Sequence, residues 1–132
     1  MTKILVVDDS EFFRKMYTDA LSQAGFEVEQ AANGKEGIEK IKALKPSLVL
    51  MDLVMPEMTG AEALVEMKKD DSVKTIPVVM LTSISADIKG EDLMLKGAVG
   101  YLVKDNVTPP DVLAKVKEIL GTSEAPLDPT KA

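Results

Sequence analysis

The residues of this sequence best suited to do chemistry are three aspartates, a threonine and a lysine. All five follow short apolar runs: Asp8, Asp9, Asp52, Thr82 and Lys104. Three carboxylates brought close together repel one another and shift each other's pKa values. A cation is needed to keep them ionised together. Oxygen ligands without sulfur or imidazole favour a hard metal ion, and a few carboxylates completed by water favour Mg²⁺.

Each of these residues also has an ordinary structural explanation when it is taken alone. The pair Asp8-Asp9 could cap a helix and complement its dipole. Asp52 could end a strand at a turn, and Thr82 and Lys104 could be a cap and a solvated charge. Their joint placement after four different apolar runs is what favours a common site.

Short apolar runs alternate with helical patterns along the chain. The apolar runs are typical of strands buried on both faces. A weaker run alternates with Glu27 and Glu29, which suits an exposed edge strand. Gly90 weakens the fourth helical pattern by about 1 kcal/mol. The predicted strands are residues 4–7, 26–31, 48–51, 78–81 and 101–103, and the predicted helices are residues 11–24, 35–45, 61–69, 87–96 and 110–120.

Five strands alternating with five helices predict an α/β fold with a parallel, doubly wound sheet. Right-handed crossovers place the carboxyl ends of all strands at one edge of the sheet. Ligands of such sheets bind at that edge, near the point where the strand order reverses. The five polar residues are therefore expected to meet there.

Composition narrows the possible functions. The chain has 132 residues, a hydrophobic fraction of 45% and a net charge of −6, which fits one globular domain without a basic nucleic-acid surface. It has no histidine and no cysteine, so an imidazole base, a phosphohistidine and a thiolate site are excluded. No apolar run is long enough for a membrane span, and a cytoplasmic location is expected. Residues 1–121 are expected to form the domain and residues 122–132 a flexible tail.

The residues around the aspartates, the threonine and the lysine resemble the receiver domains of bacterial two-component response regulators, including single-domain regulators of chemotaxis type. The resemblance extends from Lys3 to about Leu120. It implies a flavodoxin-like five-stranded sheet in the order 2-1-3-4-5. The residues that carry it are Val6-Val7-Asp8-Asp9-Ser10, Asp52-Leu53-Val54-Met55-Pro56 with Gly60, Leu81-Thr82-Ser83, and Tyr101-Leu102-Val103-Lys104.

The resemblance implies a role for each site residue. Asp52 is similar to the aspartate that accepts a phosphoryl group. Asp9, Asp52 and the backbone carbonyl of Val54 would bind Mg²⁺, and Asp8 would act through a water on the metal. Lys104 would then pair with the phosphoryl oxygens.

The resemblance also implies a switch and its partners. Thr82 would hydrogen-bond the phosphoryl group, and Tyr101 would turn inward. A histidine kinase or a histidine phosphotransfer protein would supply the phosphoryl group. A downstream protein would bind the face made by the fourth helix, the fifth strand and the fifth helix. The branched apolar residues Val54 and Ile84 would flank the attacking water, so slow self-dephosphorylation is expected.

Two other functions stay open from the sequence. One is a Mg²⁺-dependent phosphohydrolase with an aspartyl nucleophile, although such enzymes commonly carry a second aspartate at the position of Val54. The other is a degenerate receiver that only binds partners. The sequence also departs from the family where Asp105 follows Lys104, since proline is usual there. A cis peptide bond is therefore not expected at that position.

Overall fold

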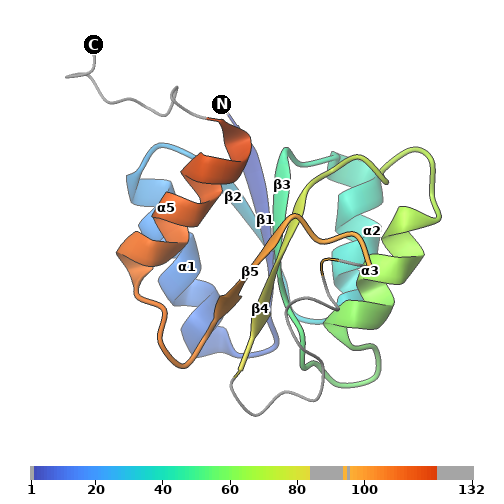
Figure 1. Ribbon diagram of the computed structural model, residues 1–132, viewed down its shortest axis with the longest axis horizontal. Coiled ribbons are helices and arrows are strands. Elements are labelled where there is room, and N and C mark those ends of the chain that lie inside the picture. The colour runs from blue at the N-terminus through green and yellow to red at the C-terminus, as the bar shows by residue number, and fades with distance from the viewer. Residues whose placement is uncertain (1, 84–93, 95, 122–132) are drawn as a thin grey trace.

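A five-stranded parallel sheet lies between two pairs of helices in the computed structural model of the chain (Figure 1). The structure describes residues 2–83, 94 and 96–121. The strand order is β2-β1-β3-β4-β5, as expected. The elements are β1 (Lys3–Val7), α1 (Glu11–Gln23), β2 (Glu27–Ala31), α2 (Gly34–Leu44), β3 (Leu48–Asp52), α3 (Gly60–Lys68), β4 (Val78–Thr82), β5 (Gly100–Val103) and α5 (Pro109–Leu120).

The burial of each strand follows from its sequence. Strands β3 and β4 are apolar apart from their last residues and are buried throughout. Strand β2 lies at one edge of the sheet, where Glu27 and Gln30 face solvent and Ala31 is buried. The alternating pattern therefore predicts the edge position correctly. The strand begins one residue later than expected, because the Phe26 N–H is bonded to the Leu21 carbonyl at the end of α1.

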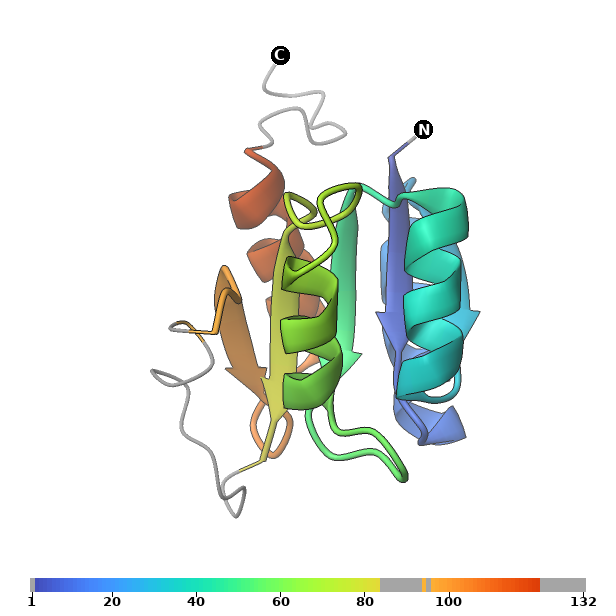
Figure 2. The same cartoon turned by 90° about the vertical axis from the view of Figure 1, so that its right-hand side faces the viewer.

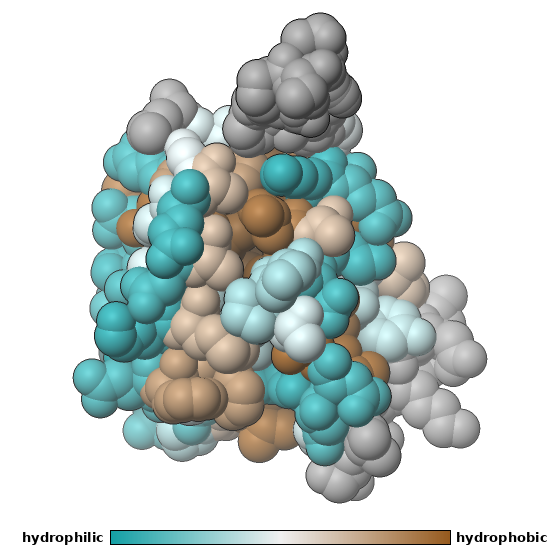
Figure 3. Space-filling model, turned by 90° about the vertical axis from the view of Figure 1, so that its left-hand side faces the viewer, coloured by the Kyte–Doolittle hydropathy of each residue, from teal (hydrophilic) through white to brown (hydrophobic). Residues whose placement is uncertain are grey.

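Each face of the sheet has its own apolar core. On one face, Tyr17 and Leu21 of α1 and Val112 and Val116 of α5 pack against the sheet. On the other face, α2 and α3 cover the sheet with residues such as Ile41, and Figure 1 shows the two pairs of helices on opposite sides. The outer face that carries α1 and α5 shows apolar side chains in a band between hydrophilic ones (Figure 3). The opposite sides of α1 and α5 are buried against the sheet, and this burial holds the two amphipathic helices in place.

Side-chain caps set where the helices begin. The hydroxyl of Thr108 accepts a hydrogen bond from the N–H of Asp111, and the Asp111 side chain accepts one from the Thr108 N–H. Helix α5 therefore begins at Pro109, one residue earlier than predicted, since proline lacks only an N–H that the first turn does not use. Gly121 ends this helix in a left-handed conformation, with φ 72°, as the sequence indicates.

Several predictions fall outside the described residues. These are most of the fourth helix at residues 87–96 with Gly90, the position of Ile84, and the tail at 122–132. Within the described residues there is no cis peptide bond, so the expectation for the bond between Lys104 and Asp105 is confirmed. None of the helices in this described part is both long and apolar enough to cross a membrane.

The loop between β3 and α3 depends on a glycine at its end. The N–H of Gly60 donates to the carbonyl of Leu53 at 2.7 Å, which folds the loop back onto the end of β3. A Cβ atom added to Gly60 would lie 2.2 Å from the carbonyl oxygen of Asp52. Because β3 is hydrogen-bonded between β1 and β4, that carbonyl cannot retreat freely.

We therefore expect Gly60→Ala to lower the free energy of unfolding by about 1–3 kcal/mol or more, the range for forced overpacking. Gly100→Ala is the matched control, because its Cβ would make only ordinary contacts of 3.7 Å or more with the side chains of Lys115 and Ile119. Urea unfolding of both variants measures the difference. Equal stability of the two variants would contradict this account of the loop.

Candidate functional site

The carboxyl ends of all five strands point to the same edge of the sheet (Figure 2). Asp8 follows β1, Asp52 ends β3, Thr82 ends β4 and Lys104 follows β5. The register aligns the last two of these strands, since Thr82 pairs with Val103 and the Lys104 N–H donates to the Thr82 carbonyl at 2.6 Å. The sheet therefore brings together side chains that are far apart in the sequence.

Asp8 is fully buried, and both of its carboxylate oxygens have partners. One oxygen accepts a hydrogen bond from the backbone N–H of Ser10 at 2.8 Å. The other lies 3.0 Å from the ammonium nitrogen of Lys104. The first contact turns the chain into α1, whose cap is the Ser10 hydroxyl. Asp8 therefore both shapes the start of this helix and holds the lysine.

Asp52 lies beside the same ammonium group. Its carboxylate is 3.3 Å from Lys104 Nζ, and the residue is only 5% exposed. Burial, followed by the negative charge of Asp8, raises the pKa of Asp52 to about 7. Lys104 and a hydrogen bond from the Val54 backbone N–H oppose this shift without cancelling it. Without a bound cation, burial and the charge of Asp8 therefore disfavour the ionised form of Asp52.

Asp9 completes the acidic group from an exposed position. One oxygen from each of Asp8, Asp9 and Asp52 lies within 4.8 Å of the others. Opposite ligands of an octahedral Mg²⁺ are separated by about 4.2 Å, so small side-chain rotations suffice to bind one ion. The donor set is oxygen only, as this ion prefers. These residues therefore fit a magnesium site.

Lys104 is surrounded on several sides. Its side chain is 13% exposed, and its ammonium group lies between Asp8 and Asp52. The ammonium nitrogen also lies 4.3 Å from the centre of the Phe13 ring. The sequence left two explanations for Lys104, a solvated surface charge or a member of the common site. The solvated charge is wrong, because the side chain is mostly buried between two carboxylates.

Thr82 and Tyr101 occupy different environments. The Thr82 side chain is buried, and its hydroxyl makes a long contact of 3.4 Å to the Ser83 carbonyl. Tyr101 lies on the edge strand β5 and is 40% exposed. In this structure its ring is therefore not turned into the protein.

The pocket at this edge is lined by residues from α1, from the end of β3 and from the loops that follow β3, β4 and β5. Val54 stands at its rim and is 62% exposed, so its side chain is available to anything that approaches Asp52. The position of Ile84, named with Val54 from the sequence, lies outside the described residues. The lining residues are Phe13, Asp52, Val54, Ser83, Lys104 and Asp105.

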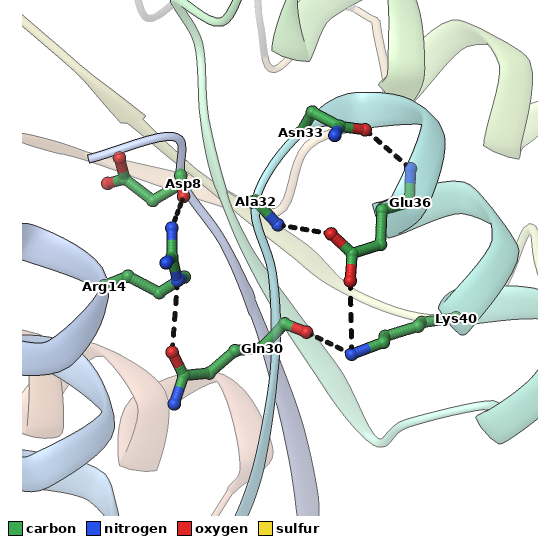
Figure 4. Close-up of polar contacts among 7 residues, drawn as sticks. All are labelled: Asp8, Arg14, Gln30, Ala32, Asn33, Glu36 and Lys40. Atoms are coloured by element: carbon green, nitrogen blue, oxygen red, sulfur yellow. Dashed lines mark hydrogen bonds and ion pairs between the residues drawn. The ribbon is translucent and has the colours of Figure 1, made fainter. Parts of the chain in front are cut away.

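Arginine 14 is a site neighbour that the sequence reasoning missed. Its guanidinium group donates to the Asp8 carbonyl at 2.7 Å and to the Gln30 side chain at 3.1 Å (Figure 4). The backbone carbonyl of Gln30 accepts a hydrogen bond from the Lys40 ammonium group, which also forms an ion pair with Glu36. These contacts tie the end of β1 to β2 and α2. No spacing pattern in the sequence marks Arg14 as a partner of the Asp8 carbonyl.

Phe13 and Tyr17 of α1 are two further neighbours of the site that were missed from the sequence. Their rings stack with centres 6.0 Å apart. The Tyr17 side chain is fully buried, and its hydroxyl has no hydrogen-bond partner in the described structure. Burial, with the carboxylates of Asp8 and Asp52, raises its pKa. The aromatic side chains of Tyr17 and Phe13 therefore extend from the apolar core to the edge of the site.

Comparisons with known proteins agree with this geometry. The family model of the response regulator receiver domain matches residues 4–117. The chemotaxis protein CheY of Thermotoga maritima is 38% identical over 120 residues, which cover 90% of this chain and 94% of that protein. The polar-differentiation response regulator DivK of Brucella anthropi is 29% identical over 118 residues, covering 89% of this chain and 95% of that protein.

A solved structure shows the same architecture. The chemotaxis response regulator CheY4 of Vibrio cholerae superimposes with a TM-score of 0.83 and 34% sequence identity, covering 90% of this chain and 98% of that chain. The expected strand order and the clustering of the three aspartates with the lysine are both present here. The chain belongs to the response regulator receiver domain family.

Proposed function

We propose that this chain relays a signal by accepting a phosphoryl group on Asp52 from a phosphohistidine of a partner kinase or phosphotransfer protein. The observation that carries the proposal is the Asp52 carboxylate itself. It lines a surface pocket, lies 3.3 Å from the Lys104 ammonium group and shares an acidic cluster with Asp8 and Asp9. The chain contains no histidine, so the donor belongs to another protein.

The transfer is a displacement at phosphorus. A carboxylate oxygen of Asp52 forms the new P–O bond while the P–N bond to the donor histidine breaks, and the imidazole keeps the electron pair. The product is an acyl phosphate. Catalysis of such a step depends on positioning and on neutralising negative charge, which Lys104 supplies from its place beside the carboxylate.

Receiver domains bind Mg²⁺ at an acidic pocket, and here Asp9, Asp52 and the Val54 carbonyl are the proposed direct ligands. Asp8 would act through a water. When bound, the ion neutralises the carboxylates and the incoming phosphoryl oxygens. The clustering of oxygens from the three aspartates supports this assignment.

The proposed switch uses the two strands next to the site. After transfer, Lys104 pairs with a phosphoryl oxygen, and the Thr82 hydroxyl donates to another in place of its long contact to Ser83. The inward movement of the Thr82 loop opens space for the Tyr101 ring, which is now 40% exposed. A downstream protein that prefers the resulting surface of β5 and α5, together with the fourth helix, completes the shift.

The test is phosphorylation by a small donor. Mixed with Mg²⁺ and acetyl phosphate, the protein is expected to gain one phosphoryl group by intact mass spectrometry, while Asp52→Asn gains none. Asp105→Asn is the matched control, because it removes a carboxylate from the same pocket. Phosphate release over many turnovers without an adduct would support a hydrolase instead. Absence of both would indicate a degenerate receiver.

A pH dependence follows from the raised pKa of Asp52. In excess EDTA, the folded protein binds this proton up to about pH 7, whereas the unfolded chain loses it near pH 4. The free energy of unfolding should therefore fall as the pH rises from about 4 to 7. Carboxylates with a lowered pKa, such as Asp111, change the free energy of unfolding only below about pH 4, so they do not affect this slope. Asp52→Asn should flatten the slope, and an unchanged slope in urea unfolding would contradict the prediction.

Magnesium should stabilise the folded state by mass action, because the unfolded chain has no preformed site. We expect a rise in Tm with added Mg²⁺ for the parent protein. Asp9→Ala should lose most of this rise. Asp71→Asn is the control, since Asp71 is a remote exposed carboxylate paired with Lys74. A parent Tm that does not respond to Mg²⁺ would argue against the metal site.

The lifetime of the acyl phosphate is expected to depend on Val54. Hydrolysis needs a water in line with phosphorus, opposite Asp52. Val54 is exposed at the pocket rim and cannot hydrogen-bond such a water. Val54→Asn should accelerate loss of the phosphoryl group relative to the parent, more than Val54→Ala does. A time course of the adduct by mass spectrometry measures this, and equal rates for the parent and the Asn variant would overturn the assignment.

A further inference from the structure

The aromatic residues of this chain are concentrated beside the site lysine. The sequence has three Phe, two Tyr and no Trp, and three of these five belong to the first two turns of α1. Phe12 meets Phe13 edge to face, with ring centres 5.3 Å apart, and Phe13 stacks on Tyr17. The Lys104 ammonium group lies 4.3 Å from the centre of the Phe13 ring.

We infer that Phe13 is a positioning residue for the phosphoryl transfer, whose ring face holds the Lys104 ammonium group beside Asp52 and guides it onto the phosphoryl group. This inference rests on the proposed function, because it assigns the way in which the lysine of that reaction is placed.

The surroundings of Lys104 support this role. An ammonium group has three N–H donors, and two carboxylates, those of Asp8 and Asp52, lie within 3.3 Å. The ring face occupies a further side of the group, and the whole side chain is only 13% exposed. A cation–π contact strengthens as the cation loses contact with water, and this lysine side chain is mostly buried.

The ring itself is held in place. It stacks on Tyr17 at an interplanar angle of 23°, and Tyr17 is fully buried in the core between α1 and the sheet. Phe12 is 72% exposed and meets Phe13 only at an angle of 79°, so the buried Tyr17 ring is the fixed support. A ring fixed in this way gives the ammonium group, at the end of a flexible stem, a rigid surface to lie against.

The ring also borders the place where the phosphoryl group must arrive. Phe13 lines the same pocket as Asp52 and Val54. When the ammonium group leaves the Asp8 carboxylate for a phosphoryl oxygen in that pocket, the ring face remains beside the moving charge. A leucine at this position would fill part of the space but offer no negatively polarised face.

The test is the affinity for beryllofluoride, a phosphoryl mimic, in the presence of Mg²⁺. Phe13→Leu should weaken binding about three- to tenfold, whereas Phe13→Tyr retains the parent affinity, because tyrosine keeps the ring face. Phe12→Leu is the matched control and should bind like the parent, since it removes a neighbouring aromatic ring that is 72% exposed, whereas the ammonium group lies over the Phe13 ring. In a Lys104→Met background, Phe13→Leu should have no further effect.

Nuclear magnetic resonance gives a readout independent of the reaction. Protons above the face of an aromatic ring are shifted upfield, so the Lys104 ε-methylene signal should lie upfield in the parent and in Phe13→Tyr, and return to an ordinary position in Phe13→Leu. Parent protein that fails to bind beryllofluoride would count against the proposed function. Parent binding with no loss in Phe13→Leu, or an equal loss in the Lys104→Met background, would overturn the positioning role.

Discussion

The close approach of carboxylates around one buried ammonium group is the interaction on which the rest of the site depends. Asp8 and Asp52 lie in a largely desolvated place, where unpaired charges are costly. Lys104 lies within 3.3 Å of both and compensates part of their charge. The raised pKa of Asp52 shows that this compensation is incomplete. A cation bound here would favour the ionised form of Asp52, which burial and Asp8 disfavour in its absence.

The parallel sheet makes this arrangement possible. Asp52 ends the central strand β3, and its neighbour β1 leads into Asp8, so two carboxylates meet where pairing to both sides fixes the backbone. Lys104 comes from the edge strand β5 and must reach across β4 to meet them. The position of its ammonium group therefore depends on contacts made far from its own strand. The α1 core, which ends in the Phe13 ring, provides a surface at the end of that reach.

Much of the fold and of the acidic site could be predicted from the sequence, because the spacing of apolar residues and the residue types that follow each strand are local signals. The apolar runs locate the strands, the alternation in residues 26–31 marks the edge strand, and the residues following the runs identify Asp52 and Lys104. The roles of Phe13 and Arg14 could not be found in this way. Both lie on an ordinary amphipathic helix, and only the packing of α1 against the sheet shows that one contacts Lys104 and the other the Asp8 carbonyl. Tertiary distances of this kind have no signature in the spacing of residues.

The charge balance also gives the proposed switch its direction. Conversion of the Asp52 carboxylate to an acyl phosphate adds negative charge in the pocket and moves it away from the backbone, toward the opening. Asp8 stays fixed by its hydrogen bond from Ser10, so it cannot follow. The Lys104 ammonium group, which is mobile on a flexible stem, then has a stronger partner on the outer side. The backbone N–H of the same residue is bonded to the Thr82 carbonyl, so any part of the shift that reaches the Lys104 backbone also reaches the junction of β4 and β5. Tyr101 lies on that same edge strand, so a local rebalancing of charge can change the exposed surface.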